Sequence, residues 1–234
     1  MIVITFALPA ESSGLIRRLT RVRSVMRHGV RVVAGNSSGR DIEVLHTGVG
    51  SRISGERLTQ YLDTSSPVLL ISSGFAGAAR SNLRVGDLVL AQNFSDAALL
   101  AEARRALREQ NVHVGKLFSA GGTVDSLAER EEIWRRYEAV AIDMETETIA
   151  RACADRELRM LSLRVLSDTP RHPFPLPGDL LFDMTRQRTP ALRLIRYLTA
   201  HPGSIARLIK FSAQVGQARR ALTEALFRVL QSDL

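Results

Sequence analysis

The order of apolar runs and helix-like stretches over the first 170 residues constrains the fold of this chain more than any other feature. A continuous apolar run of strand length stands at Met1–Ala7, and further strand-like runs stand at Pro67–Ser73, Val112–Ser119 and Met160–Leu166. Stretches with a helical spacing of apolar residues lie between them. A strand that is apolar throughout is buried on both faces, which is typical of parallel strands covered by helices on either side. The sequence therefore predicts an α/β fold.

Shorter patterns refine this prediction. Two strand-like runs, Val30–Ala34 and Ile42–His46, flank a Gly- and Ser-rich stretch that is typical of a hairpin loop. A hairpin makes its two strands antiparallel, so we expect a mixed, largely parallel central sheet flanked by helices. From Pro190 onward only helical patterns occur, at Ala191–Leu198, Ser204–Phe211 and Gln217–Leu230.

The same patterns organise the chain into one α/β domain with an appendage. We expect the α/β domain to span residues 1–185, and a basic helical C-terminal extension to span residues 186–234 and pack on it. Eight basic residues and no acidic one lie between positions 186 and 223, and their number equals the net charge of +8. The rest of the chain is therefore neutral, which indicates a local basic surface rather than a uniformly basic protein.

Composition excludes several classes of protein. A single cysteine rules out a disulfide framework and a cysteine-rich zinc site, and the histidines lack metal-ligand spacing, so we expect no metal and no cofactor. One tryptophan and three tyrosines, none of them interleaved with the basic run, argue against nucleic acid as a partner. Neither a signal peptide nor a membrane span is recognisable, so we expect a cytoplasmic location.

In α/β folds the functional site lies beyond the carboxyl ends of the strands. Residues that follow the predicted strands are Glu11, the segment Gly74–Gly77, the segment 121–125, Asp143–Glu145 and Ser167–Asp168. Carboxylates from several strand ends at one rim suggest acid–base chemistry on a neutral substrate, or a metal. Taken singly, each has a simpler explanation: Glu11 and Glu145 suit the first turn of a helix, and Asp168 suits a turn before Pro170.

Four segments together resemble the nucleoside phosphorylase/nucleosidase superfamily, most closely its methylthioadenosine/S-adenosylhomocysteine nucleosidase branch. They are the first strand with Glu11, SGFAGA (Ser73–Ala78) with LRVGDLVLA (Leu83–Ala91), AIDMETETIA (Ala141–Ala150) and RVLSDTP (Arg164–Pro170). All four stand in the family's order within residues 1–170. The resemblance implies a three-layer fold and cleavage of the N-glycosidic bond of an adenosine-type purine ribonucleoside, with a 5′ substituent. It also implies a homo-oligomer, expected to be a dimer.

The resemblance implies a role for each matching residue. Asp168 would be the general acid that protonates the departing purine, with Ser167 orienting it, and Glu11 would deprotonate the attacking water. The remaining matched residues would bind substrate: Ser73, Gly74, Phe75, Ala76 and Gly77 in the glycine segment, Thr123 and Val124 beside the base, and Asp143, Met144 and Glu145 at the ribose. Phe75 is a departure, because many members of the family have Ser or Thr there.

Two features of the sequence bear on the choice between water and phosphate as nucleophile. Phosphorylases of this superfamily surround phosphate with arginines, and their branch carries one where this chain has Ser72. The first loop, Ala7–Glu11, also lacks a basic residue. Both features favour a hydrolase. A phosphorylase that binds phosphate through Arg52, Arg80 or Arg171 is the alternative.

The C-terminal extension, residues 186–234, is compatible with other functions. Its sequence from Pro190 to about Leu222 is similar to the C-terminal part of hopanoid-associated phosphorylases, which act on an adenosylated lipid. Apolar residues at helical spacing beside Arg193, Arg196, Arg207 and Lys210 would allow contact with an anionic membrane surface. Helices packed on the domain are the competing explanation. A catalytically silent nucleoside-binding protein is an alternative of another class, against which the retention of Glu11, Glu145 and Asp168 speaks.

Overall fold

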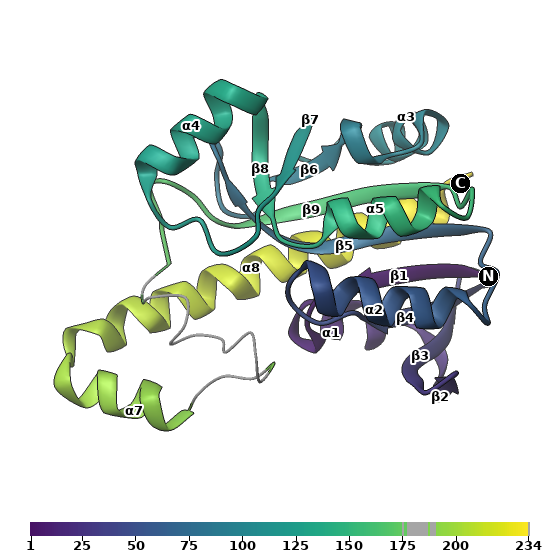
Figure 1. The fold of residues 1–234 in the computed structure, drawn as a ribbon, viewed down its shortest axis with the longest axis horizontal. Coiled ribbons are helices and arrows are strands. Elements are labelled where there is room, and N and C mark those ends of the chain that lie inside the picture. Colours follow the sequence, from purple (N-terminus) through teal and green to yellow (C-terminus); the bar gives the residue numbers. More distant parts are fainter. Residues whose placement is uncertain (175, 177–186, 188–190, 234) are drawn as a thin grey trace.

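The computed structural model describes residues 1–174, 176, 187 and 191–233. In that part of the chain helices surround one mixed sheet (Figure 1). The strands are β1 (Ile2–Phe6), β2 (Thr20–Arg27), β3 (Val30–Ser37), β4 (Arg40–His46), β5 (Leu69–Ala78), β6 (Leu88–Ala91), β7 (Val112–Ser119), β8 (Ala139–Asp143) and β9 (Met160–Asp168). The helices are α1 (Pro9–Ile16), α2 (Ser51–Leu62), η1 (Gln92–Phe94, a 3-10 turn), α3 (Ala97–Ala106), α4 (Leu127–Tyr137), α5 (Thr146–Ala154), α7 (Ala191–Ala200) and α8 (Gly203–Gln231).

The nine strands follow the order β2-β3-β4-β1-β5-β8-β7-β6-β9. β9 pairs with β5 as well as with β6, so β5, β8, β7, β6 and β9 close into a ring. Parallel pairings join β1 to β4 and β5, β5 to β9, and β7 to β6 and β8. The predicted mixed, largely parallel sheet is confirmed, and β5 lies at its centre.

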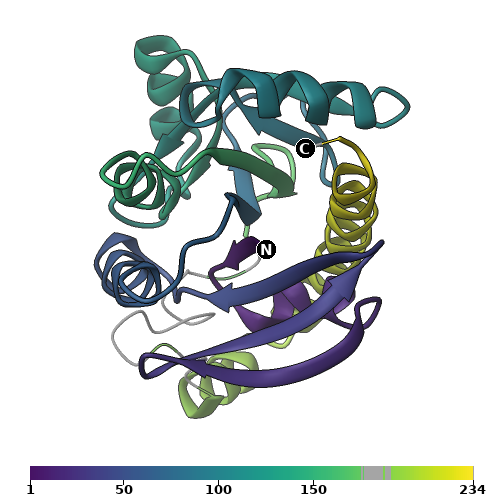
Figure 2. The same ribbon diagram turned by 90° about the vertical axis from the view of Figure 1, so that its right-hand side faces the viewer.

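Helices cover both faces of the sheet. On β1, Ile2, Ile4 and Phe6 face a core shared with α1, α3 and α8, whereas Val3 faces a second core shared with α2 and α5. Figure 2 shows α8 (yellow) on one side of the sheet and α2 (blue) on the other. The continuous apolar run at the N-terminus is therefore buried on both faces, as its sequence pattern predicts.

The N-terminal hairpin is larger than predicted. β2 was not expected at all, because its sequence TRVRSVMR has no apolar face; it is an exposed edge strand held by backbone pairing to β3. The loop predicted at 35–39 shrinks to two residues. Ser38 and Gly39 both have positive φ, 51° and 81°, which is the conformation of a tight hairpin turn.

The glycine segment 74–77 was expected as a loop after a strand ending at Ser73, and this is wrong. β5 continues to Ala78 because β9 runs alongside it and pairs from Leu70 to Gly77. β9 likewise extends past the predicted end at Leu166 and includes Ser167 and Asp168. Both site segments are thus parts of paired strands.

The two C-terminal helices expected at 204–211 and 217–230 are one helix, α8. From Ala218 onward α8 lies in the main core, and its residues there include Leu222, Leu226 and Leu230. Its first half and α7 project from the body (Figure 1). The expected domain boundary at 185/186 lies outside the described residues. Among the described helices, none combines the length and apolar character that a bilayer crossing requires.

Candidate active site

Glu11 lies in the first turn of α1, which starts directly after β1. Its side chain is buried, and each carboxylate oxygen accepts one backbone hydrogen bond: Oε2 from the Leu8 N–H at 2.8 Å and Oε1 from the Phe75 N–H at 2.8 Å. Burial raises the pKa of Glu11 from its ordinary value, although these two hydrogen bonds oppose the rise. Gly74 leaves the necessary room, because a Cβ there would lie 2.9 Å from Oε1.

Glu145 directly precedes α5, and its Oε1 accepts a hydrogen bond from the Gly50 N–H at 2.7 Å. Burial, followed by the neighbouring Asp143 carboxylate, raises the pKa of Glu145 to about 7. Gly48 and Gly50 have φ of 83° and 91°, a backbone conformation that residues with a Cβ atom disfavour. The sequence analysis gave this Gly-x-Gly turn no part in the site, yet it orients Glu145.

Asp168 ends β9 and is 1% exposed. Its Oδ1 accepts a hydrogen bond from the Ser167 hydroxyl at 3.0 Å, and its Oδ2 is paired with the Arg130 guanidinium. Burial raises the pKa of Asp168, whereas the charge of Arg130 and its hydrogen bond oppose that rise. The predicted contact between Ser167 and Asp168 is present.

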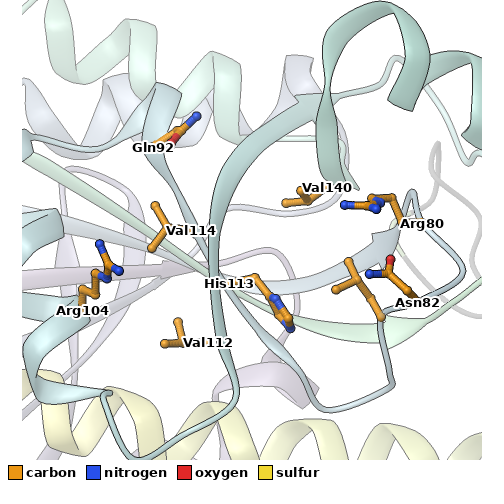
Figure 3. A pocket seen from close by; sticks show the side chains of 9 residues that line it. Arg80, Asn82, Gln92, Arg104, Val112, His113, Val114 and Val140 are labelled. Atoms are coloured by element: carbon orange, nitrogen blue, oxygen red, sulfur yellow. The ribbon is translucent and has the colours of Figure 1, made fainter.

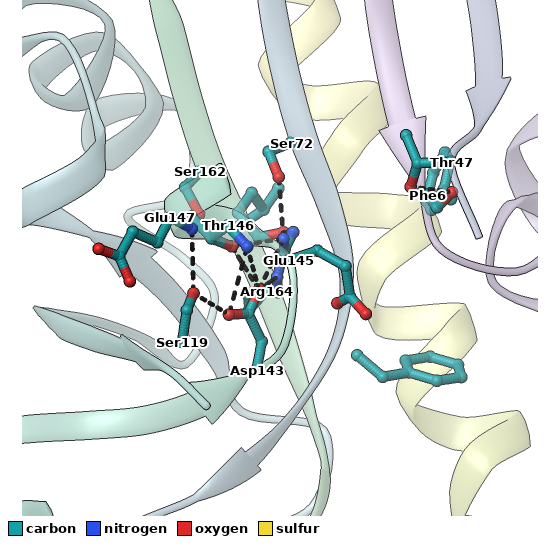
Figure 4. A network of polar contacts seen from close by, with 12 residues as sticks. Phe6, Thr47, Ser72, Ser119, Asp143, Glu145, Thr146, Glu147, Ser162 and Arg164 are labelled. Atoms are coloured by element: carbon teal, nitrogen blue, oxygen red, sulfur yellow. Dashed lines mark hydrogen bonds and ion pairs between the residues drawn. The ribbon is translucent and has the colours of Figure 1, made fainter. Parts of the chain in front are cut away.

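Asp143 is the centre of a dense polar network (Figure 4). Its Oδ1 accepts from the Ser119 hydroxyl at 2.6 Å, and its Oδ2 accepts from the Nε and Nη2 of Arg164 at 3.1 and 3.0 Å. The N–H and hydroxyl of Thr146 complete the shell, and Arg164 also donates to the Ser72 hydroxyl at 2.8 Å. Figure 4 shows Glu145 pointing away from this network, toward the side on which Phe6 and Thr47 lie.

Glu11, Glu145 and Arg164 line one small cavity of about 10 Å³. Thr5 and Ser73 line it too, and neither hydroxyl has a hydrogen-bond partner within the described part of the chain although both are buried. Buried polar atoms generally have partners, so two free hydroxyls and two carboxylates at one cavity indicate a binding site for a polar group.

β5 connects this cavity to Asp168. Gly74 contacts Glu11, and Gly77 contacts Asp168, since a Cβ at Gly77 would lie 2.9 Å from Oδ2. Three positions along a strand span about 10 Å. Glu11 and Asp168 therefore lie at the two ends of the segment Gly74–Gly77.

The other predicted residues lie around these two ends. Phe75 is half-buried and packs on the main core, so its backbone N–H, rather than a side-chain hydroxyl, reaches Glu11. Ala76 is buried in β5, and Met144 is half-buried beside Glu145. Val124 is buried and its carbonyl accepts from Arg130, whereas Thr123 is exposed. Their contacts with a substrate stay predictions.

A much larger cavity, about 560 Å³, lies elsewhere (Figure 3). It is lined by Arg80, Asn82, Leu83, Gln92, Arg104, Val112, His113, Val114 and Val140. None of the buried carboxylates described above lines it. We assign the site by the acid–base groups and the strand ends rather than by size.

Two functional side chains were not found by the sequence analysis. Arg164 stands inside a quoted motif, and a lone arginine within the apolar run MLSLRVL was a usable signal, because a buried charge needs partners. Arg130 had no such signal. It lies among the other charged residues of α4, and only the tertiary structure shows that it is buried.

Comparison with known proteins places this geometry in context. The sequence profile of a family described as the phosphorylase superfamily matches residues 1–198. A curated relative, the 5′-methylthioadenosine/S-adenosylhomocysteine nucleosidase of Staphylococcus haemolyticus (strain JCSC1435), is 24% identical in an alignment of length 196 that covers 72% of this chain and 86% of the relative.

Solved structures confirm the fold. The same type of nucleosidase from S. pneumoniae, solved with the transition-state inhibitor MT-ImmA, matches with a TM-score of 0.75 at 21% identity, over 99% of this chain and 98% of that one. Futalosine hydrolase of Helicobacter pylori strain 26695 matches with a TM-score of 0.73 at 16% identity, over 98% and 96% of the two chains. At such identities the likeness shows the fold, which is the fold class expected from the sequence.

Proposed function

The chain belongs to the phosphorylase superfamily, and from that premise we propose that it is a nucleosidase, which cleaves the N-glycosidic bond of an adenosine-type, 5′-substituted purine ribonucleoside with water as the nucleophile. The observation that carries this proposal is the placement of two buried carboxyl groups, Glu11 and Asp168, at the two ends of the β5 segment Gly74–Gly77. The names of the relative and of the neighbouring structures, nucleosidases and a hydrolase, agree with it.

Asp168 supplies the acid. When the purine leaves, its ring nitrogens gain negative charge, and proton donation by a positioned carboxyl group accelerates such a step by about 10²–10⁴. Burial favours the protonated form that this role requires. Thr123, Val124, Ala76 and Gly77 lie at this end and would surround the base.

Glu11 and Glu145 act at the other end. Glu145 accepts hydrogen bonds from ribose hydroxyls, and Met144 packs on the sugar. Glu11 takes a proton from the water that attacks the sugar carbon. A general base works best when its pKa is near the working pH, and burial moves the pKa of Glu11 in that direction. The unpartnered hydroxyl of Ser73 provides a further polar contact.

The charges at the cavity favour water over phosphate. Phosphate is a dianion that requires free cationic donors. Among the described residues that line the cavity of Glu11, Arg164 alone is cationic, and its charge is already paired with Asp143. Arg52, Arg80 and Arg171, the arginines of the phosphorylase alternative, do not line it.

The test is base release from a panel of purine nucleosides, including 5′-methylthioadenosine, adenosine and futalosine, in phosphate-free buffer. We expect adenine and a free sugar as products. A strict phosphate requirement with a sugar 1-phosphate product would instead establish the phosphorylase. Saturable binding of a nucleoside without base release would establish the silent binding protein.

A second proposal concerns the membrane. The surface formed by α7 and the first half of α8, here called the basic hairpin, exposes Ile195 (59%), Ile205 (46%) and Ile209 (66%). Arg193, Arg196, Arg207 and Lys210 are exposed on the same two helices, and no acidic residue stands between positions 187 and 223. Apolar side chains beside cations match an anionic lipid surface. A second copy of the hairpin would bring like charges together, so we assign the hairpin to lipid.

Vesicle binding tests this assignment. We expect binding to vesicles of phosphatidylglycerol mixed with phosphatidylcholine, little binding to phosphatidylcholine alone, and weakening by salt. Because each basic residue near the surface contributes about 1 kcal/mol, the double variant Arg193→Glu/Arg207→Glu should bind at least about tenfold more weakly. The matched control Arg23→Glu/Arg31→Glu changes the charge equally on exposed strands of the body. Equal loss in both variants, or no binding by the unmodified protein, contradicts the assignment.

The expected homodimer and cytoplasmic location stay predictions. Light scattering coupled to size exclusion gives the mass of the particle, and a mass of one 25.8 kDa chain at micromolar concentration would exclude the dimer.

A further inference from the structure

Arg130 of α4 is 2% exposed, and its guanidinium group donates in three directions. Its Nε donates to the Val124 carbonyl at 3.0 Å, and its Nη1 donates to the Ala78 carbonyl at 2.9 Å. Its Nη2 is bonded to Asp168 Oδ2. One side chain thus joins the loop beside the base, the end of β5 and the residue that we assign as general acid.

The packing around this pair leaves no freedom for Asp168 Oδ2. A Cβ on Gly77 would lie 2.9 Å from Oδ2 and 3.2 Å from Arg130 Nη1, so the ion pair lies directly against the backbone of β5. Oδ1 has one partner only among the described residues, the Ser167 hydroxyl. That hydroxyl has a single proton and a second acceptor, the Ala76 carbonyl at 3.4 Å. Oδ1 is therefore the oxygen left to carry and deliver a proton.

The surroundings of Asp168 shift its protonation equilibrium in opposite directions. Burial and the Asp125 carboxylate, from the loop before α4, favour the neutral acid, whereas Arg130 and the Ser167 hydroxyl favour the carboxylate. In the proposed reaction the glycosidic electron pair moves to the purine, the Asp168 proton moves to a purine nitrogen, and water captures the sugar while Glu11 takes its proton. Negative charge therefore develops on Asp168 as the bond breaks, next to a fixed guanidinium group.

We propose that Arg130 is a positioning residue of this reaction: it fixes Asp168 and the Thr123–Val124 loop relative to each other and stabilises the carboxylate that Asp168 becomes. The inference rests on the proposed nucleosidase function. A lysine could supply the charge but not the three-way geometry, because an ammonium group is a compact donor rather than a planar fork.

The experiment compares Arg130→Met and Arg130→Lys with the control Arg136→Met, an exposed arginine on the same helix. With 5′-methylthioadenosine as substrate, kcat, KM and the pH dependence of kcat are measured beside the melting temperature. In Arg130→Met we expect kcat to fall at least about 10²-fold. Its alkaline limb should move upward by about one pH unit, since loss of the positive charge makes Asp168 hold its proton more tightly.

Arg130→Lys should keep the alkaline limb near that of the unmodified protein while kcat falls about tenfold, and Arg136→Met should change neither. A purely structural role would lower the melting temperature and leave the alkaline limb unmoved. If Arg130→Met does not fold, Arg130→Gln, which keeps hydrogen-bond donors without charge, replaces it with the same expected upward shift.

Two kinds of failure are distinguishable. An active protein whose Arg130→Met or Arg130→Gln variant keeps its original alkaline limb overturns the role of Arg130 alone. An unmodified protein that releases no base from any nucleoside of the panel overturns the proposed function, and the role of Arg130 with it.

Discussion

Two arginine–aspartate pairs, Arg164–Asp143 and Arg130–Asp168, are buried to the same degree, with every side chain at most 3% exposed. They differ in how fully the protein satisfies the carboxylate. Asp143 accepts from Ser119, Thr146 and Arg164, so both of its oxygens are occupied. Within the described part of the chain, Asp168 accepts on Oδ1 from Ser167 alone.

The comparison distinguishes an aspartate that holds its neighbours in place from one that can react. A carboxylate whose two oxygens each accept several hydrogen bonds from fixed donors holds its neighbours in place, because each donor would lose a partner if the group moved. A carboxylate with one lightly held oxygen can exchange a proton. Asp143, predicted as a substrate-binding residue, therefore acts on the cavity through Arg164, whereas Asp168 suits direct chemistry.

The largest expected effect distinguishes the two aspartates by activity. Asp168→Asn keeps the shape but has no acidic proton to donate, so kcat on 5′-methylthioadenosine should fall by about 10²–10⁴, measured at a temperature at which the variant is folded. Because the buried Arg130 loses its carboxylate partner, the melting temperature should fall as well. Turnover and thermal unfolding measured on the same preparation check this. Near-normal turnover would remove Asp168 from the mechanism and leave both pairs structural.

The next effect distinguishes the pairs by stability. Arg164→Met leaves Asp143 as an unpaired buried charge, and breaking a buried ion pair typically costs about 3–5 kcal/mol of unfolding free energy. Urea unfolding measures this cost. An exposed pair provides the control: Arg52→Met, which removes the ion pair to Glu56 on α2, should cost less than about 1 kcal/mol. Equal costs at the two sites would contradict the view that Asp143 and Arg164 hold their neighbours in place.

The smallest expected effect concerns the carboxyl group of Glu145. The pKa of Glu145 is about 7 in the folded protein against an ordinary value of 4.5. Between these values the unfolded chain releases the proton while the folded protein retains it, so this group makes the protein less stable as pH rises from about 4.5 to 7. Glu145→Gln retains the acceptor for the Gly50 N–H and removes that penalty.

Glu145→Gln should therefore be more stable than the unmodified protein at pH 8, by about 1–3 kcal/mol, and the gain should vanish toward pH 4.5. Urea unfolding at a series of pH values checks both the sign and the window. A gain that is independent of pH would mean that Glu145 is ionised throughout this range.

Much of the fold was predictable because a strand that is buried on both faces is apolar along its length, and this pattern can be recognised in the sequence. β7 was predicted with its observed bounds, and β1 and β9 were found within a few residues. β2 was missed because an exposed edge strand needs no apolar face, and its partner β3 supplies the backbone hydrogen bonds. α8 was divided at Gly216 because an isolated glycine weakens a helix, but the packing of Ala218–Leu230 outweighs that local cost.

The sequence by itself determined the α/β class and the order of the motifs, and it singled out Glu11, Glu145 and Asp168 as candidate site residues. These depend on residue type and on position relative to strand ends, both of which are local. Only the tertiary structure decided that Gly74–Gly77 is a strand, that Gly50 orients Glu145, and that Arg130 rather than any other arginine of α4 faces Asp168. Each of these depends on partners that are 38 to 95 residues away in the sequence, as for Arg130 with Asp168 and Gly50 with Glu145. A local pattern does not encode which distant group will satisfy a buried charge, because that choice is made when the elements pack together.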